Sequence, residues 1–194
     1  MKPQFLLLLV SLALFACSSR LATHVFLLGS APLRPAPALT SGADTRRLVV
    51  LRSVILVDYL DTTDILVRTS EHEVKALAGA QWAERLSKGI THALRAKLEV
   101  QRPGDIITSD SPTDDPAVQI LVNINGLDTW PDGRCVLVAS WTILTDSKQP
   151  APAMHQEIFL TEARGPASVS DAGVVAAIAA TVDKLGTAIA LSAN

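Results

Sequence analysis

Residues 82–98 read WAERLSKGITHALRAKL and carry the clearest helical pattern in the chain, around which the other elements can be placed. The large apolar side chains of this stretch recur every fourth residue, at Trp82, Leu86, Ile90, Leu94 and Leu98. This spacing puts them on one face, so it predicts an amphipathic helix that starts at Trp82 and buries Ile90 and Leu94. The sequence Pro103-Gly104 is expected to close the helix.

Apolar and β-branched segments flank this helix on both sides, and they predict strands. Before the helix, residues 48–57 (LVVLRSVILV) read as one buried strand, and 65–68 and 73–77 read as shorter strands around a polar turn. After the helix come three longer strand candidates, at 118–127, 135–144 and 154–160. The sequence Trp130-Pro131-Asp132-Gly133 between the first two of them predicts a hairpin turn.

A second helix is predicted near the end of the chain. Its apolar positions follow helical spacing at Val174, Ile178, Val182, Leu185 and Ile189, with Ser170 as the expected N-cap. The order of strands, helix, strands, helix predicts one α/β domain over residues 48–194. We expect a mixed sheet of about five to six strands with the two long helices packed on it.

The first residues have the layout of an export signal. Lys2 is followed by an uncharged apolar run over residues 5–15 (FLLLLVSLALF), and Ala16 stands directly before Cys17. Residues 14–17 (LFAC) resemble the lipobox of bacterial lipoproteins, which implies cleavage after residue 16 and lipidation of Cys17. The other interpretation is ordinary cleavage that releases a soluble periplasmic protein. With a lipid anchor, Ser18 after the cysteine favours the outer membrane.

Residues 17–47 are expected to form the lipidated N-terminus, with a possible first strand at 25–28 followed by a linker rich in Pro and Ala. The formal net charge of the whole chain is −2, which argues against nucleic acid as a partner. If Cys17 carries lipid, Cys135 has no partner for an internal disulfide.

The motifs of common catalytic and cofactor sites are missing from the sequence. There is no Gly-x-x-x-x-Gly-Lys-Ser/Thr loop for ATP, no dinucleotide glycine fingerprint and no Gly-x-Ser-x-Gly elbow. The four histidines never share a metal-ligand spacing, so neither a metal nor a cofactor is expected. Cys135 lies in an apolar strand, where a cysteine is usually inert packing. We therefore expect a protein that is not an enzyme.

Two surface features are candidates for binding a partner. Tyr59 and Leu60 follow a buried strand but are surrounded by aspartates, so their side chains either fold back onto the core or project toward a partner. The polar side of the first helix carries a basic stripe, made of Arg85, Lys88, His92 and Arg95. This stripe could meet lipid headgroups or an acidic partner, or it could simply be a solvated helix face.

Several segments together resemble a known family. Residues 54–60 (VILVDYL) with Asp61, residues 65–68 (ILVR), residues 81–86 (QWAERL) and the late hairpin from 131–134 (PDGR) look like those of the PqiC-like auxiliary lipoproteins of ABC-type transport systems. The resemblance extends over essentially the whole mature chain and includes the final alanine-rich helix. Tyr59, Leu60 and Asp61 lie in one of its most recognisable stretches and Arg68 in the segment that follows, and these four become candidate partner-binding residues.

The resemblance implies a binding role rather than catalysis. Proteins of this family are lipid-anchored, periplasm-facing partners of systems that contain a permease, sometimes an ATPase, and a protein with mammalian-cell-entry (MCE) domains. These systems move lipids or other hydrophobic molecules across the envelope. Several copies of the chain could also assemble. A lipid-anchored envelope hydrolase and a stand-alone binder of a small apolar ligand remain open as alternatives.

Overall fold

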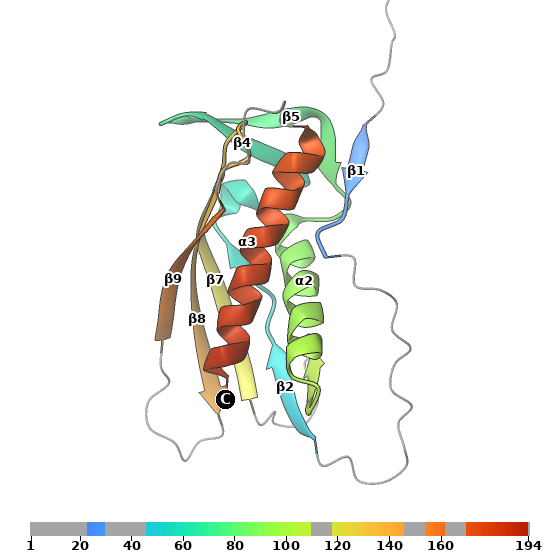
Figure 1. Cartoon of the computed structure of the whole chain (residues 1–194), viewed down its shortest axis with the longest axis vertical. Coiled ribbons are helices and arrows are strands. Elements are labelled where there is room, and N and C mark those ends of the chain that lie inside the picture. Colours follow the sequence, from blue (N-terminus) through green and yellow to red (C-terminus); the bar gives the residue numbers. More distant parts are fainter. Residues whose placement is uncertain (1–22, 30–45, 110–117, 146–153, 162–169, 194) are drawn as a thin grey trace, which may run out of the picture.

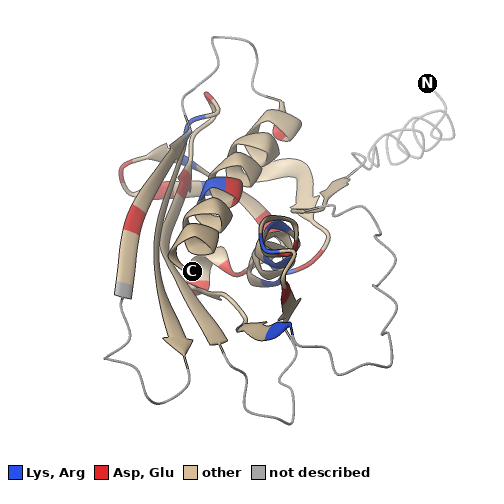
Figure 2. Cartoon of the chain, turned by 60° about the horizontal axis from the view of Figure 1, so that its bottom comes forward, with Lys and Arg blue, Asp and Glu red and all other residues tan. Residues whose placement is uncertain are grey.

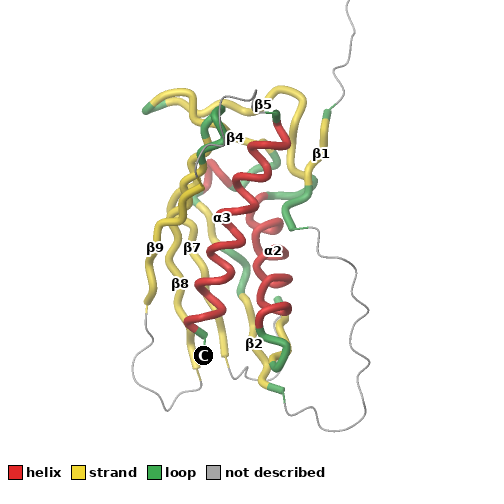
Figure 3. The backbone as a smooth tube through the Cα atoms, in the orientation of Figure 1, coloured by secondary structure: helices red, strands yellow, loops and turns green. Residues whose placement is uncertain are grey.

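The computed structural model describes residues 23–29, 46–109, 118–145, 154–161 and 170–193. Within these ranges, most of the strands form one layer, and two helices, α2 (Leu86–Gln101) and α3 (Asp171–Ser192), lie side by side on one face of it (Figures 1 and 3). The expected export signal and the lipidation site Cys17 lie outside the described ranges.

The larger sheet has six strands and carries most of the core. Its order is β6 (Asp105–Thr108), β2 (Arg47–Leu51), β7 (Val118–Thr129), β8 (Cys135–Thr145) and β9 (Met154–Thr161), and the short β3 (Ile55–Leu56) also pairs with β7. The pairs β6–β2, β2–β7 and β3–β7 are parallel, whereas β7–β8 and β8–β9 are antiparallel. This mixed sheet with two helices confirms the α/β fold class.

A second sheet of three strands lies at one end of the domain. It has the order β1 (His24–Phe26), β5 (Glu73–Trp82), β4 (Asp64–Ser70), in which β1 runs parallel to β5 and β4 runs antiparallel to it. The possible first strand at 25–28 is therefore a strand, starting at His24 and joining this smaller sheet. The sequence pattern predicted one mixed sheet and not this division into two.

The expected single strand over residues 48–57 is wrong, because the segment is broken in the middle. Leu51 pairs with Ile120 and Ile55 pairs with Asn123, so this segment has one residue more than β7 between the two pairings. At the break, the backbone N–H of Val54 donates to Thr91 Oγ1 on α2 at 3.0 Å instead of to a strand. The helix thus fixes where β2 ends and β3 begins.

The expected start of the first helix is also wrong. Trp82 is the last residue of β5, and its backbone N–H donates to the carbonyl of Thr63 at 2.7 Å. Its side chain is nevertheless buried, which explains why it matched the spacing of the helix. The helix itself begins at Leu86, and Ile90 and Leu94 are fully buried, as predicted.

Helix α3 covers β7, β8 and β9. It begins as predicted, because Ser170 is its N-cap and the Ser170 side chain accepts from the backbone N–H of Gly173. By length and composition α3 is apolar enough to cross a membrane. Here its apolar side packs on the sheet and buries Val174, Ile178, Val182, Leu185 and Ile189. The apolar character of α3 is thus accounted for by the core.

Candidate partner-binding surface

The turn that carries Tyr59 and Leu60 points the two side chains in opposite ways. Asp58–Leu60 form one turn of 3₁₀ helix between β3 and β4. Leu60 is only 4% exposed and packs into the core, whereas Tyr59 is 47% exposed. Of the two candidates, Tyr59 is therefore the one whose side chain is exposed, and Leu60 anchors the turn in the core.

A second exposed apolar side chain precedes this turn. Ile55 in β3 is 64% exposed, while its neighbour Leu56 is buried. Because residues 48–57 were predicted to form one continuous buried strand, the exposure of Ile55 was not expected. The signal for it was the polar pair Arg52-Ser53, which interrupts the apolar run where the strand breaks. Ile55 and Tyr59 are thus two exposed apolar side chains four residues apart in the sequence, and we call them the Ile55/Tyr59 surface.

Asp61 holds the Tyr59 turn against the start of α2. Its carboxylate accepts from the backbone N–H of Ser87 at 3.1 Å and lies 3.3 Å from Arg85 Nε. Burial opposes ionisation of Asp61, but the hydrogen bonds from Ser87 and the charge of Arg85 outweigh it and lower the pKa of this carboxyl. The N-cap position, Arg85, makes no side-chain cap bond, so Asp61 caps the helix from a distant loop.

Arg68 joins the two sheets. It lies on β4 in the smaller sheet, and its Nε donates to Asp128 Oδ1 on β7 at 2.8 Å. Its Nη1 donates to the carbonyl of Glu71 at 2.7 Å. These bonds engage the guanidinium within the chain, so the structure gives Arg68 a role in positioning the smaller sheet.

The basic stripe on α2 is largely balanced by acidic neighbours. Arg85 pairs with Asp61, His92 Nδ1 lies 2.9 Å from Glu84 Oε1, and Arg95 pairs with Glu99 at 3.7 Å. The fourth member, Lys88, is exposed. Figure 2 accordingly shows blue and red residues mixed on this helix rather than a uniformly positive face. Because three of its four members pair with acidic side chains, the stripe attracts an anionic surface less strongly than four unpaired cations would.

The groups that could support chemistry are buried or dispersed. Cys135 is fully buried on β8, and Thr129 Oγ1 donates to its Sγ at 3.5 Å. Burial raises the pKa of the Cys135 thiol, which disfavours the reactive thiolate. Within the ranges that the structure describes, no three His, Cys, Asp or Glu side chains gather in a way that could hold a metal ion.

Two solved structures have a fold similar to that of this chain. A crystal structure of an uncharacterized protein has a TM-score of 0.71 and 19% identity, covering 89% of this chain and 99% of that chain. Protein XCC0632 from Xanthomonas campestris has a TM-score of 0.56 and 16% identity, covering 75% of this chain and 81% of that chain. At these identities the likenesses establish the fold alone. No curated protein sequence matches significantly.

Family membership follows from the sequence match. The model of the family described as "ABC-type transport auxiliary lipoprotein component" matches residues 30–190. This match contains α2, α3 up to residue 190, the larger sheet and the Ile55/Tyr59 surface. Because the match spans most of the chain, this protein belongs to the family of ABC-type transport auxiliary lipoprotein components.

Proposed function

We propose that this chain is a non-enzymatic accessory subunit of an ABC-type envelope transport system, anchored by lipid on Cys17 and acting by binding. The observation that carries the proposal is the family match over residues 30–190. In this proposal the chain is held at the inner face of the outer membrane and docks on a periplasmic MCE-domain protein. The permease and ATPase lie on other chains, and the cargo is a lipid or another hydrophobic molecule.

The Ile55/Tyr59 surface supports docking at this position. Covering a large apolar side chain that is exposed to water is favourable, and interfaces concentrate their binding energy in a few such anchors. The turn is fixed to α2 by Asp61 and to the core by Leu60, so a partner would meet a preformed surface. We assign the principal contact to Tyr59 because aromatic side chains are the most frequent interface anchors.

Replacing Tyr59 tests the docking role. Tyr59→Ala is expected to weaken partner binding by about 2 kcal/mol or more, roughly thirtyfold in affinity, and to leave folding intact because the side chain is half exposed. The measurement is recovery of the MCE-domain protein with the lipidated chain from solubilised envelopes. Ile158→Ala serves as the matched control, because Ile158 is 59% exposed on the edge strand β9. Equal partner recovery with both variants would place the contact elsewhere.

Replacing Cys17 tests the anchor. Cys17→Ser removes the thiol that would carry lipid, so the variant is expected to incorporate no labelled fatty acid and to lose its membrane association. The measurement is radioactive fatty-acid labelling followed by fractionation of the envelope. Labelling of the variant at the level of the natural chain would show that Cys17 is not the site.

A further inference from the structure

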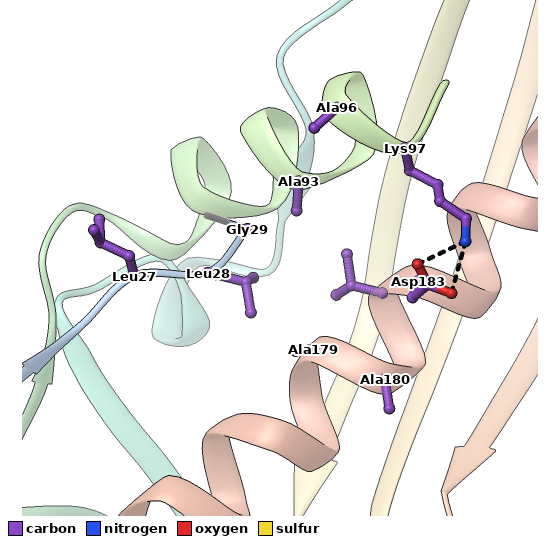
Figure 4. A pocket seen from close by; sticks show the side chains of 10 residues that line it. Leu27, Leu28, Gly29, Ala93, Ala96, Lys97, Ala179, Ala180 and Asp183 are labelled. Atoms are coloured by element: carbon purple, nitrogen blue, oxygen red, sulfur yellow. Dashed lines mark hydrogen bonds and ion pairs between the residues drawn. The ribbon is translucent and has the colours of Figure 1, made fainter. Parts of the chain in front are cut away.

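A groove with a volume of about 540 Å³ lies between α2 and α3. Residues 27–29, which follow β1, form one of its walls, and the two helices form the others (Figure 4). This volume falls within the range of small-molecule binding sites, about 300–1,000 Å³. The aliphatic residues along it are mainly Leu27, Leu28, Ala93, Ala96, Ala179 and Ala180.

The groove exists because the side chains that face it are short. Alanines on both helices leave open the space that leucine side chains would fill at a helix–helix contact. On the third side, Gly29 lies directly on α2, where a Cβ would come within 2.7 Å of Ala93 Cα. Gly29 has φ of 79°, a conformation that favours glycine. Glycine at position 29 therefore allows residues 27–29 to pack against α2 at Ala93.

The lining determines the class of ligand that the groove would accept. Its charged members, Lys97 and Asp183, pair with each other at 2.7 Å and so neutralise each other at one end (Figure 4). The side chains between this pair and Leu27 are aliphatic, and apolar atoms make up the larger part of the groove's lining. A polar ligand buried there would lose hydrogen bonds to water without replacement, which costs a few kcal/mol per group. A hydrocarbon chain loses none.

The position of the groove relative to the anchor indicates where such a hydrocarbon would come from. Leu27 stands ten residues after Cys17 in the sequence. A chain of that length spans at most about 35 Å even when fully extended, so a lipidated Cys17 keeps this wall close to the bilayer. Leu27 is also 63% exposed at the edge of the groove, where it could cover an inserted chain.

We propose that the groove between α2 and α3 binds one acyl chain of a membrane phospholipid. This inference rests on the lipid-anchored role proposed above and adds a direct contact with lipid to it. The chain would lie along the alanines of the two helices, with Leu27 and Leu28 over it. The Lys97–Asp183 pair would mark the end of the apolar path.

Photo-crosslinking in vesicles tests the proposal. The mature lipidated protein is placed in phosphatidylethanolamine and phosphatidylglycerol vesicles that contain a trace of phosphatidylcholine with a diazirine in one acyl chain. After irradiation, labelled peptides are mapped by mass spectrometry, and we expect label on residues 93–97 and 179–183. Ala179→Phe places a large side chain in the groove, because Ala179 lies on the same face of α3 as Asp183, which pairs with Lys97 of α2, and it should lower this labelling about tenfold or more. The matched control is Ala176→Phe, an exposed position one turn earlier on α3 that does not line the groove.

The outcomes separate this proposal from its alternatives. Equal labelling of the Ala179→Phe and Ala176→Phe variants, or label confined to other segments, overturns the proposal. A second preparation carries the diazirine in the fatty acids of Cys17, and groove labelling in that preparation alone would assign the site to the chain's own anchor and overturn the phospholipid. Thermal unfolding confirms that each variant is folded, and Ala96→Leu is a second, milder block. Partner recovery is measured separately, so failure of the docking role does not imply failure of the groove.

Discussion

The Thr91 hydroxyl connects the first long helix to the break between β2 and β3, and its removal should have a specific cost. Thr91 is buried on α2, its Oγ1 accepts from the backbone N–H of Val54 at 3.0 Å, and it donates to the carbonyl of Ser87 at 2.7 Å. Thr91→Val keeps the branched shape but leaves the Val54 N–H buried without this acceptor. An unsatisfied buried donor costs about 1–3 kcal/mol, so we expect destabilisation of that size.

Thr181→Val provides a matched control for this experiment. Thr181 is equally buried on a helix, but its hydroxyl donates to the carbonyl of Ile178 in the same helix. Its removal strands no backbone donor and gives up, besides that bond, only the hydroxyl's contact with Cys135 Sγ at 3.6 Å, so we expect a smaller loss, near the low end of the about 0.5–1.5 kcal/mol that one hydrogen bond contributes. The assay is urea unfolding of the two variants and the natural chain, with the midpoint and slope fitted together. Equal midpoints for Thr91→Val and the natural chain would refute the role of Thr91 at the strand break.

Two further predictions concern the core and the pH dependence of stability. Ile90→Ala should destabilise the fold by about 2–5 kcal/mol because it opens a cavity in a fully buried site, whereas Arg95→Ala on the exposed side should change unfolding by less than about 0.5 kcal/mol; equal unfolding midpoints for the two variants would contradict the orientation of α2. Asp105 is mostly buried, which opposes its ionisation, but hydrogen bonds from Arg47 and Arg102 outweigh this and lower its pKa below the ordinary 3.8. The stability that Asp105 contributes is therefore present above that pH and lost as the pH falls through its folded-state pKa. The difference between the natural chain and Asp105→Asn in urea unfolding should shrink from pH 7 to pH 3, and a difference that does not change with pH would contradict the ionic role of Asp105.

The elements that the sequence predicted well are those whose pattern is local and long. The spacing of Ile90 and Leu94 gave the buried side of α2, and Ser170 gave the start of α3. The hairpin between β7 and β8 followed from the residues around Pro131, where the backbone N–H of Gly133 donates to the carbonyl of Trp130. In each case the stabilising contact lies within a few residues of the signal, so the sequence alone is sufficient.

The elements that the sequence missed depend on contacts between distant residues. Trp82 matches the spacing of the helix but ends a strand, because its backbone pairs with Thr63 and lies beside Phe26. The strand β6 (Asp105–Thr108) has only four residues and depends on pairing with β2. The division into two sheets is likewise a property of pairing partners, which periodicity does not reveal.

The candidate surface could be predicted only in part, because it too depends on contacts between residues that are distant in the sequence. The choice between burial and projection at Tyr59 and Leu60 could be posed from the aspartates around them, but only the packing of Leu60 decided it. The roles of Asp61 and Arg68 were out of reach, because their partners Ser87 and Asp128 are far along the chain. Asp61 and Arg68 are engaged by these long-range bonds and Leu60 is buried. Of the four candidate partner-binding residues, Tyr59 is therefore the one whose side chain is most available to a partner.

The attachment of the Tyr59 turn to α2 bears on how a partner would be bound. The carbonyl of Thr62 accepts from the backbone N–H of Leu86 at 3.1 Å, immediately beside the contact of Asp61 with Ser87. The backbone N–H groups of two successive residues at the start of α2 thus hold the turn. Further along the same helix, Thr91 accepts from the backbone N–H of Val54 at the preceding strand break. Ordering a loop on binding costs free energy, whereas a surface that is already fixed avoids that cost. This rigidity supports docking through Tyr59 on a preformed surface, in which a single aromatic side chain can account for much of the affinity.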